Sequence, residues 1–116
     1  MPTCGLDERV GDVRQRVEAA GWDACVVVNQ EHIVLGLLRS GELGRDAEMV
    51  AEGAMRPGPS TFRPFLPIEE MAAYMIEHDL ESAPVTTPGG RLLGLLRRAD
   101  AVRAAHELHA HGHGHA

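Results

Sequence analysis

The sequence contains no lysine, and all 11 of its basic residues are arginine. Without lysine there is no Schiff-base residue for pyridoxal-phosphate chemistry and no P-loop lysine for NTP hydrolysis. Aromatic residues make up only 3% of the chain, so Val, Leu, Ile, Met and Ala must build its core. The missing lysine therefore excludes two large classes of enzyme.

Cysteines and long apolar runs are also scarce. The two cysteines, Cys4 and Cys25, are too few for a disulfide scaffold and lack the spacing of a metal site. Cys25 lies in the apolar run 24–28, which predicts a buried, unreactive thiol. The longest apolar run, 33–38, is too short to cross a bilayer, and no signal-peptide pattern begins the chain. We therefore expect a cytoplasmic protein that does not bind membranes.

Positive charge is the minority charge in this chain. The 17 acidic residues leave a net charge of −6, which argues against a nucleic-acid partner. With 44% hydrophobic and 24% charged residues, the composition is that of a globular protein. A length of 116 residues fits one domain, or two small subdomains that share a core.

The chain contains an internal repeat. The string Gly-Leu-Leu-Arg at 36–39 recurs at 94–97, an offset equal to half the length of the chain. The same half-chain offset aligns apolar residues along much of the sequence, for example Val10 with Ile68, Val13 with Met71, and Val27 with Val85. We therefore predict two copies of one small unit, a first repeat at 1–52 and a second at 61–108. A linker rich in Pro and Gly at 53–60 joins them, and a tail follows at 109–116.

The second repeat predicts a helix, two strands and a final helix. Pro67 opens the first helix, whose apolar face comprises Ile68, Met71, Ala72, Met75 and Ile76. Strands are expected at 83–87 and 92–96, with a turn at 88–90 between them. The final helix should cover 98–108, with an apolar stripe of Ala101, Val102, Ala105 and Leu108.

The first repeat gives the same order of elements. We expect a helix over 10–20, strands at 24–29 and 33–38, and a helix over 41–51 with Ser40 as its N-cap. The inward residues of that last helix would be Leu43, Ala47 and Val50. An extended stretch can precede each unit. Because neither unit of roughly 50 residues can bury its sheet alone, the two sheets should pack together around a pseudo-twofold axis.

The second repeat also carries a set of motifs in a fixed order. They are Ala83-Pro84-Val85, Gly89-Gly90, and Gly94-Leu95-Leu96 followed by Asp100. This order resembles a CBS domain (the cystathionine-β-synthase type), and two in tandem resemble a Bateman module. The first repeat is a weaker match, since it lacks the Pro-Val pair and has Glu42 where the family favours Asp. The resemblance implies an α/β fold of two CBS repeats, and a regulatory protein rather than an enzyme.

The resemblance implies that an adenosine-containing ligand (AMP, ADP, ATP or S-adenosylmethionine) binds in clefts between the repeats. It implies Asp100 as the residue that binds the ribose hydroxyls, with Glu42 at the matching position of the first repeat. An acid in the first turn of a helix is also explained by the helix dipole alone. The family's Ser/Thr position is taken by Arg97, and by Arg39 in the first repeat. An arginine there can pair with a phosphate or fill the cleft.

Other candidate ligand contacts lie nearby. Arg98 stands at a helix N-terminus and could help to bind a phosphate, although adjacent arginines are more often solvent-facing. Ser60 and Thr61 follow the linker, where members of the family often contact the ligand, and a simple turn is the alternative. The segment 83–85 would offer backbone groups and an apolar wall to an adenine, or it would serve only as core.

The end of the chain is rich in histidine: His106, His109, His111, His113 and His115. Such a tract can bind a divalent metal such as Zn²⁺, Ni²⁺ or Cu²⁺. Adventitious binding and a non-native extension are the alternatives, because no second shell orients the imidazole rings.

Three functions therefore stay open. The first is a regulatory module that binds an adenosine ligand, forms a homodimer and reports the energy state to an unidentified protein partner. The second is a ligand-free dimerising scaffold, and the third is a metal-responsive protein that works through its tail. We expect no catalytic residue and no catalytic cofactor, since neither a GxSxG motif nor a GxGxxG after a strand occurs.

Overall fold

The computed structural model describes residues 1–113, with side chains described to residue 108. Its first half contains β1 (Thr3–Cys4), α1 (Val10–Ala19), β2 (Cys25–Val28), β3 (Val34–Leu38), α2 (Ser40–Leu43) and α3 (Ala51–Ala54). The elements that follow are β4 (Arg56–Pro57), α4 (Ile68–Glu77), β5 (Ser82–Thr86), β6 (Leu92–Arg97) and α5 (Arg98–His113). The fold class is mixed α/β, as predicted.

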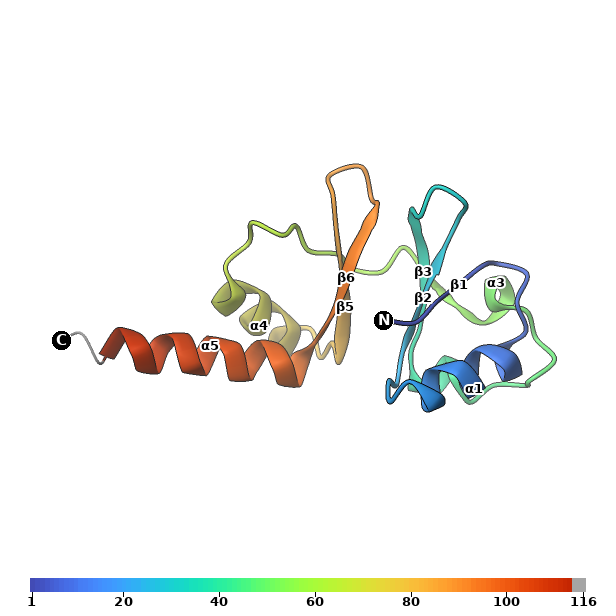
Figure 1. Cartoon of the computed structure of the whole chain (residues 1–116), viewed down its shortest axis with the longest axis horizontal. Coiled ribbons are helices and arrows are strands. Elements are labelled where there is room, and N and C mark those ends of the chain that lie inside the picture. The colour runs from blue at the N-terminus through green and yellow to red at the C-terminus, as the bar shows by residue number, and fades with distance from the viewer. Residues whose placement is uncertain (114–116) are drawn as a thin grey trace.

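Two small sheets face each other in the middle of the molecule (Figure 1). One has the strand order β1-β2-β3-β4, and the other pairs β5 with β6. α1 and α3 lie on the outer side of the first sheet, and α4 and α5 lie on the outer side of the second (Figure 1). Val26, Leu37 and Leu92 are buried together from both sheets, so they form the core between them.

Backbone pairing follows the half-chain offset found in the sequence. The N–H groups of Val34 and Leu92 are equivalent, and each donates at 2.9 Å to a carbonyl of the opposite hairpin turn. Between these two bonds, Ile33 pairs with its own equivalent, Arg91. The pseudo-twofold axis therefore passes through the tips of the two hairpins.

Two further features repeat with the same offset. The first is an extended segment before each unit: Cys4 pairs in parallel with Val27, and Phe62 pairs in parallel with Val85. The second is the end of the first helix of each unit, where a left-handed residue turns the chain into the next strand. Gly21 (φ 74°) follows α1 and Asp79 (φ 52°) follows α4. Glycine adopts this conformation without strain, and aspartate is among the few other residues that tolerate it.

The apolar helix faces and the cysteine are largely where the sequence predicts them. Cys25 is fully buried, as are Val10, Val13, Val17 and Met75, while Met71 and Ala72 are nearly so. The prediction is wrong for one residue of the apolar face of α4, because Ile76 is 61% exposed. The first sheet and α1 share one apolar cluster, and α4 with α5 form another around Phe62 and Ala83.

The prediction of one continuous helix over 41–51 is wrong. The chain instead forms α2, which ends at Leu43 with Gly44 as its C-cap, and then a separate α3. The N-cap of α2 is Arg39, not Ser40, and Val50 is exposed rather than inward. The cause is long-range pairing: the N–H groups at the start of α1 donate to the carbonyls of Met49 and Ala47, which holds that segment in a series of turns instead of a helix.

The final helix is longer than the predicted 98–108, since α5 continues to His113. Of its predicted apolar stripe, Ala101 is buried, Ala105 is half-buried, and Val102 and Leu108 are exposed. Within the described part of the chain, no helix combines the length and the apolar character that a membrane crossing needs.

Candidate functional site

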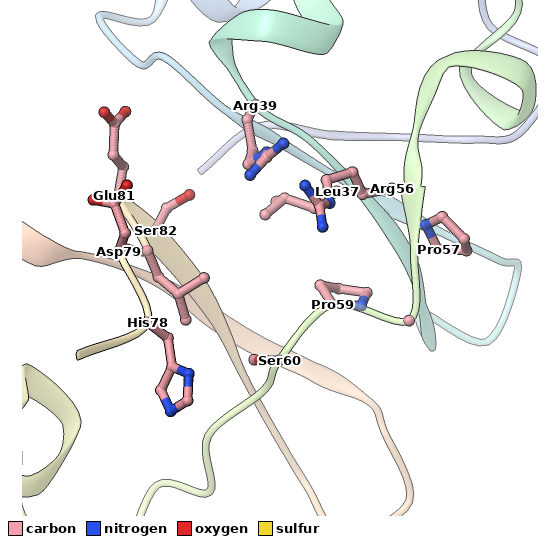
Figure 2. A pocket seen from close by; sticks show the side chains of 12 residues that line it. Leu37, Arg39, Arg56, Pro57, Pro59, Ser60, His78, Asp79, Glu81 and Ser82 are labelled. Carbon is pink, nitrogen blue, oxygen red and sulfur yellow. The ribbon is translucent and has the colours of Figure 1, made fainter. Parts of the chain in front are cut away.

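A cavity of about 380 Å³ lies between the two repeats, and we call it the open pocket (Figure 2). Its volume falls within the range of small-molecule sites. Three segments line it: the end of β3, the linker, and the turn between α4 and β5. The lining residues are Leu37, Arg39, Arg56, Pro57, Gly58, Pro59, Ser60, His78, Asp79, Leu80, Glu81 and Ser82.

Local backbone geometry builds both walls of the open pocket. On one wall, Arg56 and Pro57 pair with Leu37 and Gly36, so the linker adds a strand to the edge of the first sheet. A side chain at Gly36 would collide with Met55, which shows how closely the linker approaches β3. On the other wall, the left-handed Asp79 turns the chain from α4 into β5 and brings 78–82 to face the linker.

Arg39 and Glu42 form a bidentate ion pair at the rim of the open pocket. The Arg39 Nε and Nη2 atoms donate to the two Glu42 carboxylate oxygens at 2.9 and 3.1 Å, and the Arg39 backbone N–H donates to Oε1 at 3.0 Å. The hydrogen bond from Arg39 lowers the pKa of Glu42, and the nearby charge of Arg56 lowers it further. The same bond raises the pKa of Arg39. Glu42 is thus a buried carboxylate that fixes the first arginine of the pocket.

The opposite wall carries acids and a histidine. His78 stacks on Tyr74 with 4.1 Å between the ring centroids, and Asp79 accepts from Arg98 at 3.0 Å. Glu81 lies beside them, across the pocket from Arg39 and Arg56 (Figure 2). Arginines on one side and carboxylates on the other suit a ligand with an anionic end and a hydroxyl-bearing end, since guanidinium pairs with phosphate and carboxylate accepts from a diol.

Across the pseudo-twofold axis, the positions equivalent to the open pocket hold an arginine that contacts the other repeat. Arg97, the equivalent of Arg39, reaches across from β6 to the first repeat. Its Cζ atom lies 3.8 Å from the centroid of the Trp22 ring, and its Nη2 donates to the Gly21 carbonyl at 3.4 Å. Its Nε is buried and has no hydrogen-bond partner among the described residues. We call this second site the closed cleft.

A comparison with protein families matches the CBS domain model to residues 50–107, which is half of the chain. The chain belongs to the CBS domain family. CBS domains are typically regulatory, and this match names no catalytic family. The comparison with curated proteins found no match.

Solved structures of CBS proteins share this fold. The CBS domains of a transcriptional regulator from Streptococcus pneumoniae superpose with a TM-score of 0.80 at 21% identity, over 88% of this chain and 86% of that one. CBSX2 in complex with AMP gives a TM-score of 0.83 at 20% identity, over 93% and 89% of the two chains. The cytosolic domain of the Mg²⁺ channel MgtE in complex with ATP gives 0.78 at 22% identity, over 89% of this chain and 44% of that one.

In this CBS protein, two of the candidate ligand contacts lie at the open pocket. Ser60 lines it directly, and Glu42 acts there through Arg39. Arg98 reaches its far wall by pairing with Asp79. These three residues come from the linker, the first half of the chain and the second half, so residues from both halves contribute to the pocket.

The other candidate contacts do not line the open pocket. Asp100 accepts from Arg103 at 2.7 Å, one helical turn along α5, and Arg97 lies on Trp22. The Thr61 hydroxyl accepts from Arg63 at 3.1 Å. Within 83–85, Ala83 and Pro84 are buried in β5, and the Pro84 carbonyl accepts from the Phe62 N–H.

Sequence reasoning missed four ionisable residues of this site: Arg56, His78, Asp79 and Glu81. The sequence did contain evidence for Asp79 and Glu81. The half-chain offset makes 79–82 equivalent to 21–24, which is the turn before a buried strand. Arg56 carried no signal in the sequence, since its position depends on the pairing of the linker with β3.

The histidine tail is described only in part. His106 is exposed on α5, while the side chains of His109, His111 and His113, and all of His115, lie outside the described residues. Among the described residues, no group of three or more potential metal ligands comes together.

Proposed function

We propose that this CBS protein is a regulatory module that binds an adenosine-containing nucleotide in the open pocket. The observation that carries the proposal is the pocket itself: a cavity between the repeats with Arg39 and Arg56 on one wall and Asp79 and Glu81 on the other. CBSX2 binds AMP and the MgtE domain binds ATP, which supports the same ligand class for this chain. AMP, ADP, ATP and S-adenosylmethionine are the candidates.

The two walls divide the recognition of such a ligand. Arg39 is already held by Glu42, whereas Arg56 is exposed, so Arg56 is the arginine available to a phosphate. Arg39 then adds charge from a fixed position. The carboxylates of Asp79 and Glu81 accept hydrogen bonds from ribose hydroxyls.

The regulatory output belongs to the same proposal. Three segments from both repeats line the pocket, so a ligand there favours one packing of the repeats over another in proportion to its difference in affinity for the two. Signalling to a protein partner, homodimer formation, energy sensing and a cytoplasmic location are the further parts of the proposal.

Isothermal titration with AMP, ADP, ATP and S-adenosylmethionine tests it, with thermal shift at about 1 mM ligand as a screen. A ligand at 100 times its Kd stabilises the fold by about 2.7 kcal/mol, which raises Tm by several degrees in a domain of this size. We expect Arg56→Gln to weaken binding by roughly tenfold or more, because it removes a charge-assisted hydrogen bond.

The matched control is Arg45→Gln, an exposed arginine that does not line the open pocket. Equal loss of affinity in both variants would contradict the proposed site, and absence of binding by the unaltered protein would contradict the function. The latter result would favour the ligand-free scaffold. Zn²⁺ in the same screen, with a chain truncated after Leu108 for comparison, tests metal binding by the tail.

A further inference from the structure

The two clefts are built from equivalent positions but are in different states. The equivalent residues, related by the half-chain offset, are Arg39 and Arg97, Asp79 and Gly21, and Leu80 and Trp22. In the open pocket the arginine stays on its own repeat. In the closed cleft the arginine crosses to the other repeat.

The acid that follows each arginine explains the difference. Glu42 reaches back to Arg39 and binds it through both carboxylate oxygens, so that guanidinium is held on its own repeat at the wall of the pocket. The equivalent of Glu42 is Asp100, which is one methylene shorter and is engaged by Arg103 at 2.7 Å. No carboxylate among the described residues pairs with Arg97 in place of Asp100.

The residue opposite each arginine completes the difference. Across the open pocket stands Leu80, whose aliphatic side chain offers nothing to a cation. Across the closed cleft stands Trp22, the one tryptophan of the chain. An indole face is the strongest aromatic partner for a guanidinium, and the Gly21 carbonyl accepts from the same group.

We infer that Arg97, stacked on Trp22, closes the second cleft, so that the protein binds one nucleotide per chain, in the open pocket. This inference rests on the proposed function, and it differs from the prediction that Asp100 binds a ribose. It also gives Arg97 a structural role, because the contact ties β6 of the second repeat to the turn after α1 of the first.

Titration of AMP and ATP into Arg97→Ser tests the inference, since serine removes the guanidinium and leaves space at the cleft. The unaltered protein should bind one nucleotide per chain, and Arg97→Ser should bind two. Trp22→Leu, which places at this position the residue found at Leu80 in the open pocket, removes the other partner of the contact and should also bind two nucleotides per chain. Arg45→Ser is the control for loss of an exposed arginine.

A second readout needs no nucleotide. Because Trp22 is the one fluorophore of its kind, uncovering its ring in Arg97→Ser should change its emission and increase its quenching by acrylamide, relative to Arg45→Ser. The measurement is made at a temperature where far-UV circular dichroism shows each variant to be folded, because unfolding would also uncover the Trp22 ring.

The outcomes separate the inference from the proposed function. If the unaltered chain binds two nucleotides, the second cleft is not closed, and the proposed nucleotide binding still holds. The same conclusion follows if Asp100→Ala abolishes binding and Arg56→Gln does not. One nucleotide per chain in Arg97→Ser, with Trp22 uncovered, overturns Arg97 as the closing residue. No binding to any variant overturns the function and the stoichiometry together, and Trp22 emission then decides whether Arg97 covers the ring.

Discussion

At the scale of single residues, two arginines in equivalent positions are held by different partners. Arg39 is held by a carboxylate, and Arg97 by an aromatic ring and a carbonyl. The carboxylate pair is the stronger contact, because Glu42 is nearly buried and donors around it satisfy both its oxygens. This pair fixes the rim of the open pocket, and its charge state is therefore coupled to the stability of the fold.

The Arg39–Glu42 pair predicts a pH-dependent stability. Because the folded-state pKa of Glu42 lies below the 4.5 of a free glutamate, the pair's contribution is complete above about pH 4.5 and is lost as the pH falls through the lower, folded-state pKa. We expect Glu42→Gln to lower the free energy of unfolding at pH 7 by about 1.5–3 kcal/mol. In the same variant, the free energy of unfolding should fall less steeply as the pH is lowered. Urea unfolding from pH 7 to pH 3 measures both effects.

The control for this prediction is Glu77→Gln, an exposed glutamate at the end of α4. It should leave the pH profile of the unaltered protein unchanged. A Glu42→Gln profile that stays parallel to that of the unaltered protein would contradict the role of the ion pair.

The limits of sequence prediction at this scale are visible in the same two arginines. Both stand after the same Gly-Leu-Leu string, so the sequence indicates that each either pairs with a phosphate or fills a cleft. The first cause of the different arrangement is the acid that follows each arginine, because Glu42 is one methylene longer than Asp100. The second cause is Trp22, which belongs to the other repeat and is far from Arg97 along the chain. Local pattern carries no information about such a distant partner.

At the scale of elements, one glycine allows the start of α1 to lie against the turns that follow α2. A Cβ atom at Gly11 would lie 2.8 Å from the Cβ of Ala47, closer than such atoms approach in real proteins. The Gly11 N–H donates to the Ala47 carbonyl at 3.0 Å in the same place. This contact is what replaces the long helix that the pattern predicts over 41–51.

Gly11→Ala should therefore destabilise the protein, although alanine favours helices. We expect the free energy of unfolding to fall by about 1–3 kcal/mol through overpacking against Ala47. The matched control is Gly41→Ala in α2, where a new Cβ meets no atom within 4 Å. That variant should gain about 0.5–1 kcal/mol from helix propensity. Urea unfolding of both measures the difference, and a stabilised Gly11→Ala would refute the close contact.

Most elements were predictable because the two copies support each other. The strands predicted at 24–29 and 33–38 correspond to β2 and β3, and the helix over 10–20 corresponds to α1. The helix over 41–51 was not predictable, because its backbone groups are taken by α1, a partner that is distant along the chain. The linker strand β4 was missed for a similar reason, since only pairing with β3 makes it a strand.

At the scale of the whole molecule, the pseudo-twofold axis couples the core between the sheets to the open pocket. Ile33 and Arg91 meet on the axis, and Val26, Leu37 and Leu92 fill the space between the sheets beside it. Leu37 belongs to both regions, because it packs with Leu92 and also lines the open pocket. The packing of the repeats and the shape of the pocket therefore depend on the same side chain.

Leu92→Ala should reveal this coupling. Leu92 is buried between the sheets, so the cavity left by truncation should lower the free energy of unfolding by about 2–5 kcal/mol. Because Leu37 loses its neighbour, the affinity for the nucleotide should fall as well, even though Leu92 does not line the open pocket. Leu93→Ala is the control: the next residue is 52% exposed, so both quantities should change little. Urea unfolding and nucleotide titration of the two variants measure this, at a temperature where both are folded. A Leu92→Ala protein that is less stable but binds with unchanged affinity would mean that the pocket keeps its shape when the packing between the sheets is loosened.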